Sequence, residues 1–196
     1  MPIESLVTRC KKAVVISSTL AALFFASSAI PSRAQSSGSS IQLAATALSP
    51  VDYNFVAQAN LGAPFQVDSG RIAEQAATTA EIRDYAHLMV VTHVPVIDAL
   101  NRILSNKNIG APANTLLHGA YDTMIFSLKA ESGAALDRDY VEGQVDYQKG
   151  NAALFRNEIE NGNDPALKDF ARATLPKIVD HLDRALKLAA EKTASK

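Results

Sequence analysis

Aromatic and sulfur-containing residues are scarce in this chain of 196 residues, which has no tryptophan, one cysteine and only 6% aromatic residues. A protein that stacks nucleic-acid bases or sugars needs exposed aromatic rings, so this composition argues against such a platform. The charges are also nearly balanced, with 19 basic and 20 acidic residues. A chain without a basic excess has no electrostatic footprint for nucleic acid or anionic lipid, and we expect no nucleic-acid partner.

The common catalytic motifs are missing as well. The sequence contains no Gly-rich phosphate loop, no Gly-x-Ser-x-Gly nucleophile turn and no His-Glu-x-x-His metal motif. The acidic pairs Asp137–Asp139 and Glu158–Glu160 have a spacing that is typical of solvated helix faces. We therefore assign no catalytic residue, and a protein that is not an enzyme is the favoured interpretation.

The first 34 residues have the pattern of a secretory signal peptide. A basic segment (residues 9–12) precedes an uncharged apolar run (residues 13–29), and small residues, Ser32 and Ala34, follow at the cleavage positions. The run is short for a membrane anchor. We expect cleavage after Ala34, with Ala29 as the alternative, and hence a periplasmic protein without integral membrane insertion.

Cleavage would also change the composition of the mature chain. The only cysteine, Cys10, leaves with the signal, so no disulfide stabilises the mature protein. The signal carries four of the 19 basic residues and one of the 20 acidic residues, which leaves 15 and 19 and a net charge of −4. Residues 35–49 begin with a Ser/Gly-rich stretch and are expected to form a flexible tether.

The remaining residues, 50–192, carry a helical pattern. Apolar residues recur every three or four positions, and no strand-like alternation occurs. Start signals stand at Ser49-Pro50, at Thr78 with Glu81, and at Asp164-Pro165. Gly62 and Pro64 predict a kink or a split in the first helix. The predicted helices run from Ser49 to Ala76, from Thr78 to just before Gly110, from about Asn114 to Glu131, from about Leu136 to Asn161 and from Asp164 to about residue 192. Four long helices, with a short one in the crossover connection, predict an all-α, ferritin-like four-helix bundle.

Four polar residues interrupt the apolar stripes of the long helices. Gln66, His93, Gln148 and His181 each lie near the middle of one helix. If the helices pack in register, the four side chains meet at one level of the core. Buried polar groups are normally paired with one another, so the favoured interpretation is a buried polar layer that fixes the register of the bundle.

A metal centre is the alternative interpretation of this layer. Helix bundles hold two iron or manganese ions with inward-facing carboxylates and histidines. Here the layer has no carboxylate, so it suits at most one zinc or copper ion on His93 and His181. We expect no cofactor under the first interpretation and a single transition-metal ion under the second.

Two stretches, residues 81–93 and residues 162–171, resemble an exported bacterial family catalogued as domain of unknown function 4142 (DUF4142). The second stretch continues into Leu175-Pro176 and His181-Leu182, and the resemblance covers nearly all of residues 51–190. Members of the family are similar to ferritin-like bundles and are often labelled outer-membrane proteins. The residues of this chain fit a soluble periplasmic protein better than that label.

Departures from the family pattern fall on the polar layer. Members usually carry Glu at the position of Gln66, Asp-His at Thr92-His93 and His at the position of Gln148, whereas His181 is retained. The resemblance thus implies an ancestral metal centre in which two positions have become amides. We expect a non-enzymatic binding or interaction module, with an envelope-associated protein or a second copy as partner. A ferritin-like metal-binding protein or oxidase is the alternative.

Overall fold

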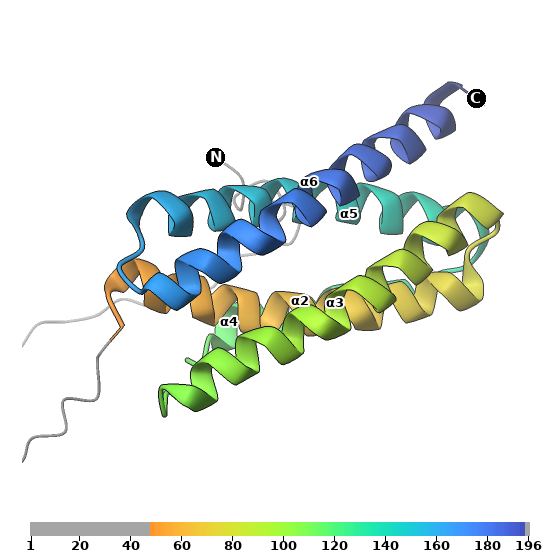
Figure 1. Cartoon of the computed structure of the whole chain (residues 1–196). Helices are drawn as coiled ribbons and strands as arrows, with labels where there is room; N and C mark the ends of the chain where they lie inside the picture. Colours follow the sequence, from red (N-terminus) through yellow and green to blue (C-terminus); the bar gives the residue numbers. More distant parts are fainter. Residues whose placement is uncertain (1–47, 195–196) are drawn as a thin grey trace, which may run out of the picture. The chain divides into compact units, whose positions relative to one another are not determined.

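The computed structural model describes residues 48–194 and, within them, five α-helices and no strand (Figure 1). The helices are α2 (Pro50–Ala76), α3 (Ala80–Asn106), α4 (Thr115–Ala130), α5 (Gly133–Asn161) and α6 (Pro165–Ala194). The predicted all-α bundle is confirmed. The predicted signal peptide (residues 1–34) and most of the predicted tether lie outside the described residues.

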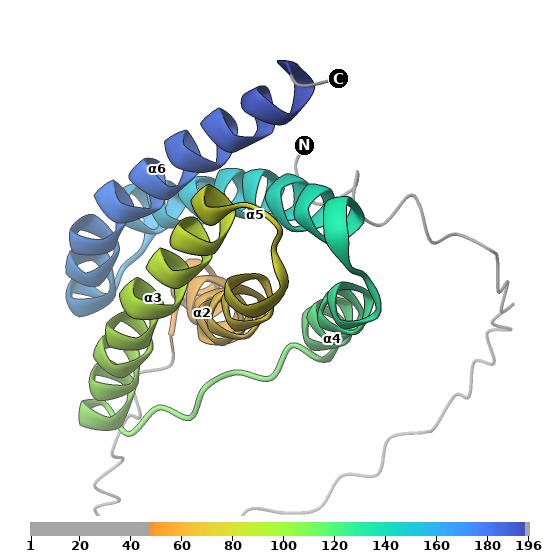
Figure 2. The same ribbon diagram turned by 90° about the vertical axis from the view of Figure 1, so that its right-hand side faces the viewer.

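The four long helices form two antiparallel hairpins, α2 with α3 and α5 with α6. Helix α2 lies between α3, α5 and α4 and packs against all three (Figure 2). The connection formed by residues 107–114 passes beneath α2 in this view and brings α4 to the far side of α2. The short helix therefore lies in the crossover connection, as the sequence predicts.

The helix starts at Ser49 and Asp164 follow the sequence prediction closely. Ser49 and Asp52 form a capping box, in which each side chain accepts a hydrogen bond of 3.2 Å from the backbone N–H of the other. Asp164 caps α6 by accepting from the N–H groups of Ala166 at 3.0 Å and Leu167 at 3.2 Å. Leu48 packs against the core, so the last two residues of the predicted tether, Leu48 and Ser49, belong to the fold.

The predicted starts of α3 and α5 need correction. The cap of α3 is Thr79, whose hydroxyl accepts from Ile82 N–H at 3.3 Å, and not Thr78. Thr78 instead donates its backbone N–H, at 2.9 Å, and its hydroxyl to the carboxylate of Asp137 in α5. Helix α5 begins at Gly133, three residues before the predicted Leu136, and Gly133 adopts a positive φ of 61°.

Of the two predicted outcomes for the first helix, a kink or a split, the split is wrong, because α2 continues through Gly62 and Pro64 to Ala76. The small residues on this helix instead allow close approaches by its neighbours. A Cβ at Gly62 would lie 2.3 Å from the hydroxyl oxygen of Tyr147 in α5. A Cβ at Gly70 would lie 2.9 Å from the carbonyl oxygen of Ala86 in α3.

Two apolar clusters form the core, one towards each end of the bundle. The first cluster surrounds the α2–α3 turn and includes Tyr85, Leu136 and Tyr140. The second includes Phe55 and Phe155, whose rings meet edge to face at 4.9 Å. Along α2 the two clusters are separated by the turn that carries Gln66, so the polar layer divides the core.

Helix α3 is long and apolar enough to cross a membrane by length and composition, the only such helix in residues 48–194. Its stretch without Asp, Glu, Lys or Arg, residues 85–97, has 13 residues, whereas a spanning helix needs about 20 apolar residues. One face of the helix, from Ile82 to Leu104, is buried against the bundle. Of its most apolar 18-residue stretch, 22% is buried, and the absence of membrane insertion stays a prediction.

Candidate functional site

The four polar residues singled out from the sequence are all buried. Gln66 on α2 and Gln148 on α5 have no exposed surface, while His93 on α3 and His181 on α6 are 4% and 3% exposed. Each of the four long helices therefore contributes one of the four predicted side chains to the interior, and Gln144 of α5, 2% exposed, adds a third buried amide. The side chains form two pairs, an amide pair and a histidine pair, and Met89 contacts both.

The amide pair is held by long contacts. Gln148 Nε2 lies 3.5 Å from Gln66 Oε1, from Gln144 Oε1 and from Met89 Sδ. Distances of 3.5 Å are at the weak end for N–H···O hydrogen bonds. Gln66 Nε2 and Gln148 Oε1 have no partner among the described residues. The amides therefore satisfy one another only in part.

The histidine pair has better-defined hydrogen bonds. The two ring centroids are 5.3 Å apart, with a tilt of 41° between the rings. His93 Nδ1 lies 2.9 Å from the carbonyl oxygen of Met89, so Nδ1–H donates and Nε2 keeps its lone pair. Thr92 donates its hydroxyl to Leu88 O at 2.6 Å, and its oxygen lies 3.4 Å from His181 Nε2. His181 Nε2–H then donates to Thr92, which leaves Nδ1 of His181 buried without a partner.

Burial keeps both imidazoles neutral. It lowers the pKa of His93 to about 4, against a weaker opposing effect of the Met89 hydrogen bond. Burial also lowers the pKa of His181 to about 4, and the neighbouring His93 adds to this effect. The hydroxyl of Tyr85 donates to the carbonyl oxygen of His181 at 3.2 Å, and burial raises the pKa of Tyr85. The whole layer is thus uncharged at neutral pH.

The donor set does not fit a dinuclear iron or manganese centre. Such centres need carboxylates that bridge the ions and balance their charge. Within residues 48–194, no group of three or more His, Cys, Asp or Glu side chains is placed to hold a metal ion. Two neutral imidazoles and two amides leave His93 and His181 as the only nitrogen ligands in the layer.

A small cavity adjoins the layer. The cavity that His93 lines has a volume of about 10 Å³, which is close to the minimum for one water molecule. Its walls also include Thr174 from α6 and Tyr147 from α5. A larger depression of about 240 Å³ lies on the surface, between Glu81 and Asp84 of α3 and Arg184 of α6. Both signs of charge line it, so it favours no ligand of one charge.

The remaining histidines lie outside the layer. His87 is exposed and pairs with Glu74 at 2.8 Å, and His118 is exposed and pairs with Asp122 at 2.9 Å. The prediction that His87 is solvated is confirmed.

The prediction of two solvated acidic pairs is wrong for one member of each. Asp137 is 1% exposed and Glu158 has no exposed surface. Asp52, in the first turn of α2, is also 1% exposed. The three carboxyl groups lie towards the ends of the bundle, away from the polar layer. Their buried state depends on partners from distant segments, and no local pattern reveals it.

Comparison with family models matches residues 37–188 to a domain of unknown function, DUF4142. The chain belongs to the DUF4142 family. No curated protein and no solved structure matches it. Membership in DUF4142 confirms the resemblance of residues 81–93 and 162–171, and the family's description assigns no activity to the bundle.

Proposed function

We propose that this DUF4142 protein is an exported, periplasmic bundle that acts by binding a protein partner through its surface. The observation that carries the proposal is the exposure of large apolar side chains on α4, where Leu116 is 88% and Phe126 is 74% exposed. Large exposed apolar surfaces mark interaction sites, and these two residues are the most exposed of the large apolar side chains in the part of the chain that the structure describes. Export rests on the signal-like sequence of residues 1–34.

Helix α4 is suited to such a role because it is held loosely. Of its 16 residues only Leu128 is buried, although the helix is rich in Leu, Met, Phe and Ile. Tyr121 stacks on Phe65 of α2 at 4.4 Å, which anchors one face of the helix. The opposite face, with Leu116 and Phe126, is left for a partner.

The neutral, closed polar layer supports a structural role for the core. Its side chains are buried, uncharged and next to a cavity of about 10 Å³. A substrate would need a far larger pocket, since ligand sites usually enclose several hundred Å³. The layer therefore suits a structural role in which it fixes the register of the helices. Under this proposal the partner binds at the surface of the bundle.

In-cell photocrosslinking tests the binding role. A crosslinking residue at position 116 should give discrete adducts, and Phe126→Ser in the same protein should abolish them. The reverse pair, a crosslinking residue at position 126 with Leu116→Ser, should behave in the same way. Position 186 is the matched control, because Leu186 is an apolar α6 residue that is 41% exposed. A second copy as partner would appear as a dimer of the signal-free protein in analytical ultracentrifugation. A monomer that gives no adduct from α4 would overturn the proposal.

A metal-binding protein or oxidase is the second candidate, and the state of the histidine pair favours it. His93 Nε2 and His181 Nδ1 keep lone pairs, and the second of these nitrogens has no partner among the described residues. With the thioether of Met89 in the same layer, the donors suit copper or zinc better than iron.

Metal analysis separates the two candidates. The signal-free protein, purified without chelator and then incubated with iron, zinc or copper, would retain stoichiometric metal under the second candidate. Loss of that metal in both His93→Ala and His181→Ala, with retention in His87→Ala, would assign the ligands. A metal-free protein after all three incubations rules this candidate out.

A further inference from the structure

A buried carboxyl group without a donor lies in the last turns of α5. Glu158 has no exposed surface, and neither of its oxygens accepts a hydrogen bond among the described residues. Its carboxyl group lies against the turn that follows. A Cβ at Gly162 would lie 2.4 Å from Glu158 Oε1, so there is room only for glycine at this position. A carboxylate in this position would carry its charge without compensation, which costs far more than burial of a neutral group.

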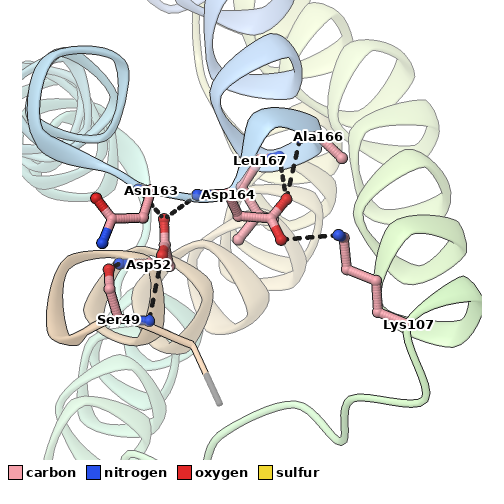
Figure 3. A network of polar contacts seen from close by, with 7 residues as sticks. All are labelled: Ser49, Asp52, Lys107, Asn163, Asp164, Ala166 and Leu167. Carbon is pink, nitrogen blue, oxygen red and sulfur yellow. Dashed lines mark hydrogen bonds and ion pairs between the residues drawn. The ribbon is translucent and has the colours of Figure 1, made fainter. Parts of the chain in front are cut away.

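Both oxygens of the neighbouring Asp52 carboxylate accept hydrogen bonds from backbone N–H groups (Figure 3). Its Oδ1 accepts from the backbone N–H groups of Asn163 at 2.9 Å and Asp164 at 3.1 Å, and its Oδ2 accepts from Ser49 at 3.2 Å. Burial acts to raise the pKa of Asp52, but the hydrogen bonds outweigh it and the pKa is lowered. Asp52 thus remains an anion and joins the start of α2 to the α5–α6 turn.

The other charges at this junction do not neutralise Glu158. Lys107, which follows α3, pairs with Asp164 Oδ2 at 2.7 Å (Figure 3). Lys168 on α6 lowers the pKa of Glu158 and outweighs the opposite effect of Asp164, but it does not outweigh burial and Asp52. The Asp52 carboxylate is the group that acts most strongly on Glu158, and it raises the pKa of Glu158 both as a hydrogen-bond partner and as a like charge. Two carboxylates cannot share a hydrogen bond unless one of them is protonated, so Glu158 carries the proton and donates it to Asp52.

We propose that Glu158 and Asp52 form a proton-operated latch, which closes the junction of α2, α5 and α6 when one proton lies between the two carboxyl groups. Loss of the proton places two negative charges side by side in a buried site. The turn at residues 162–164, which depends on Asp52 for two of its N–H groups, then loosens. The conformational response is local, at the end of the bundle opposite the α2–α3 turn.

A proton suits this site better than a metal cation. Both oxygens of Asp52 already accept N–H donors, and the junction offers no third free carboxylate, because Asp164 caps α6 and pairs with Lys107. Burial, followed by the hydrogen bond and the charge of Asp52, raises the pKa of Glu158 to about 7. The latch therefore responds to pH changes around neutrality.

Carbon-13 NMR of the Glu158 carboxyl group tests the latch on the intact bundle. The expected titration midpoint lies near pH 7, far above the ordinary value of 4.5. In the same sample, the amide protection factors of Asn163 and Asp164 should fall roughly 10- to 100-fold between pH 5 and pH 8. A midpoint near 4.5, or a titration that shifts when Ca²⁺ is added, overturns the proposal; the second result would indicate a cation site.

The matched variant is Glu158→Gln, which keeps the shape and a hydrogen-bond donor to Asp52 but cannot ionise. Its protection at Asn163 and Asp164 should stay constant over the same pH range. Glu160→Gln, at an exposed position two residues away, should behave like the wild type. A wild-type pH response that persists in Glu158→Gln would show that another group controls the turn.

Discussion

His93 and His181 are kept neutral by burial, which makes the bundle sensitive to acid. Their pKa values are lowered from 6.5 to about 4, so between these values the unfolded chain binds protons that the folded chain does not. Stability is complete above pH 6.5 and is lost as the pH falls towards 4, by about 1.4 kcal/mol per pH unit for each histidine. Urea unfolding from pH 4.5 to 7 measures this slope.

The matching substitutions are His93→Gln and His181→Gln, made one at a time. Each removes one titrating group and should reduce the slope by about 1.4 kcal/mol per pH unit. His87→Gln, at an exposed position, is the control. An unchanged slope in both core variants would mean that the imidazoles titrate normally and are not desolvated.

The amide pair should be replaceable. Gln66 Nε2 and Gln148 Oε1 have no partner among the described residues, and their mutual contact is 3.5 Å long. A buried polar group without a partner costs about 1–3 kcal/mol, and exchange of both partners for apolar groups of similar shape is neutral or stabilising. Gln66→Met with Gln148→Met should therefore raise the free energy of unfolding by up to about 3 kcal/mol. A large loss of stability in denaturant titrations would instead assign the pair an essential structural role.

Sequence reasoning finds residues whose environment follows from their own helix. The stripe positions of Gln66, His93, Gln148 and His181 come from a period of 3.6 residues, and all four are buried. The buried state of Asp137 depends on Thr78, which is 59 positions away. Such a pairing between distant segments leaves no pattern in the local sequence. An acidic residue within a helix is therefore predicted to be exposed to solvent.

At the scale of the element, the contact between α2 and α5 depends on the absence of a side chain at Gly62. A Cβ there would lie 2.3 Å from the Tyr147 hydroxyl oxygen and 3.3 Å from the ring carbon that bears it. Gly62→Ala should lower the free energy of unfolding by about 1–3 kcal/mol, because the tyrosine must move. Thermal or urea unfolding measures the loss.

Tyr147→Phe is the compensating variant, since it removes the clashing oxygen. In that background Gly62→Ala should be neutral or stabilising by about 0.5–1 kcal/mol, which is the usual gain of Ala over Gly within a helix. Gly150→Ala, on α5 with open space around it, shows that gain without any clash. Equal losses for Gly62→Ala in both backgrounds would exclude the hydroxyl as the cause.

Element boundaries were predictable where a cap acts locally. Asn114 caps α4 through a 3.1 Å bond to Leu117 N–H, and the predicted helix matches the observed one within a residue at each end. The start of α3 was displaced by one residue because Thr78 turns to Asp137. The position of α4 on the bundle, with only Leu128 buried, depends on packing that the helix's own periodicity does not encode.

At the scale of the whole molecule, two opposing titrations set the stability of the bundle. A raised pKa for Glu158 means that the folded state binds more protons than the unfolded state between pH 4.5 and about 7. This contribution is complete below pH 4.5 and is lost as the pH rises through about 7, whereas the histidines contribute in the opposite sense. The free energy of unfolding should therefore peak near pH 6.5, where the histidine contribution is complete.

Glu158→Gln isolates the descending part of that profile. The variant should lose the decline that the wild type shows between pH 6.5 and 8, and its stability should rise more steeply from pH 4.5 to 6.5. Chemical denaturation at half-unit pH steps compares the two proteins directly. Superimposable curves would mean that Glu158 is not protonated in the folded bundle.

The connection of residues 107–114, which passes α2, is a position at which the chain could be cleaved into two folding units. Residues 107–114, with α4 after them, form the covalent link between the two hairpins, whose internal helix pairs lie close together in sequence. Short-range contacts of this kind form early in folding, so each hairpin can assemble before the two meet. Cleavage within the connection would leave Thr78–Asp137 at one end and Asp52–Asn163 at the other to guide reassociation. Fragments 48–110 and 111–194 would then associate as a heterodimer, in the register that the hydrogen bonds of the Asp137 and Asp52 carboxylates set.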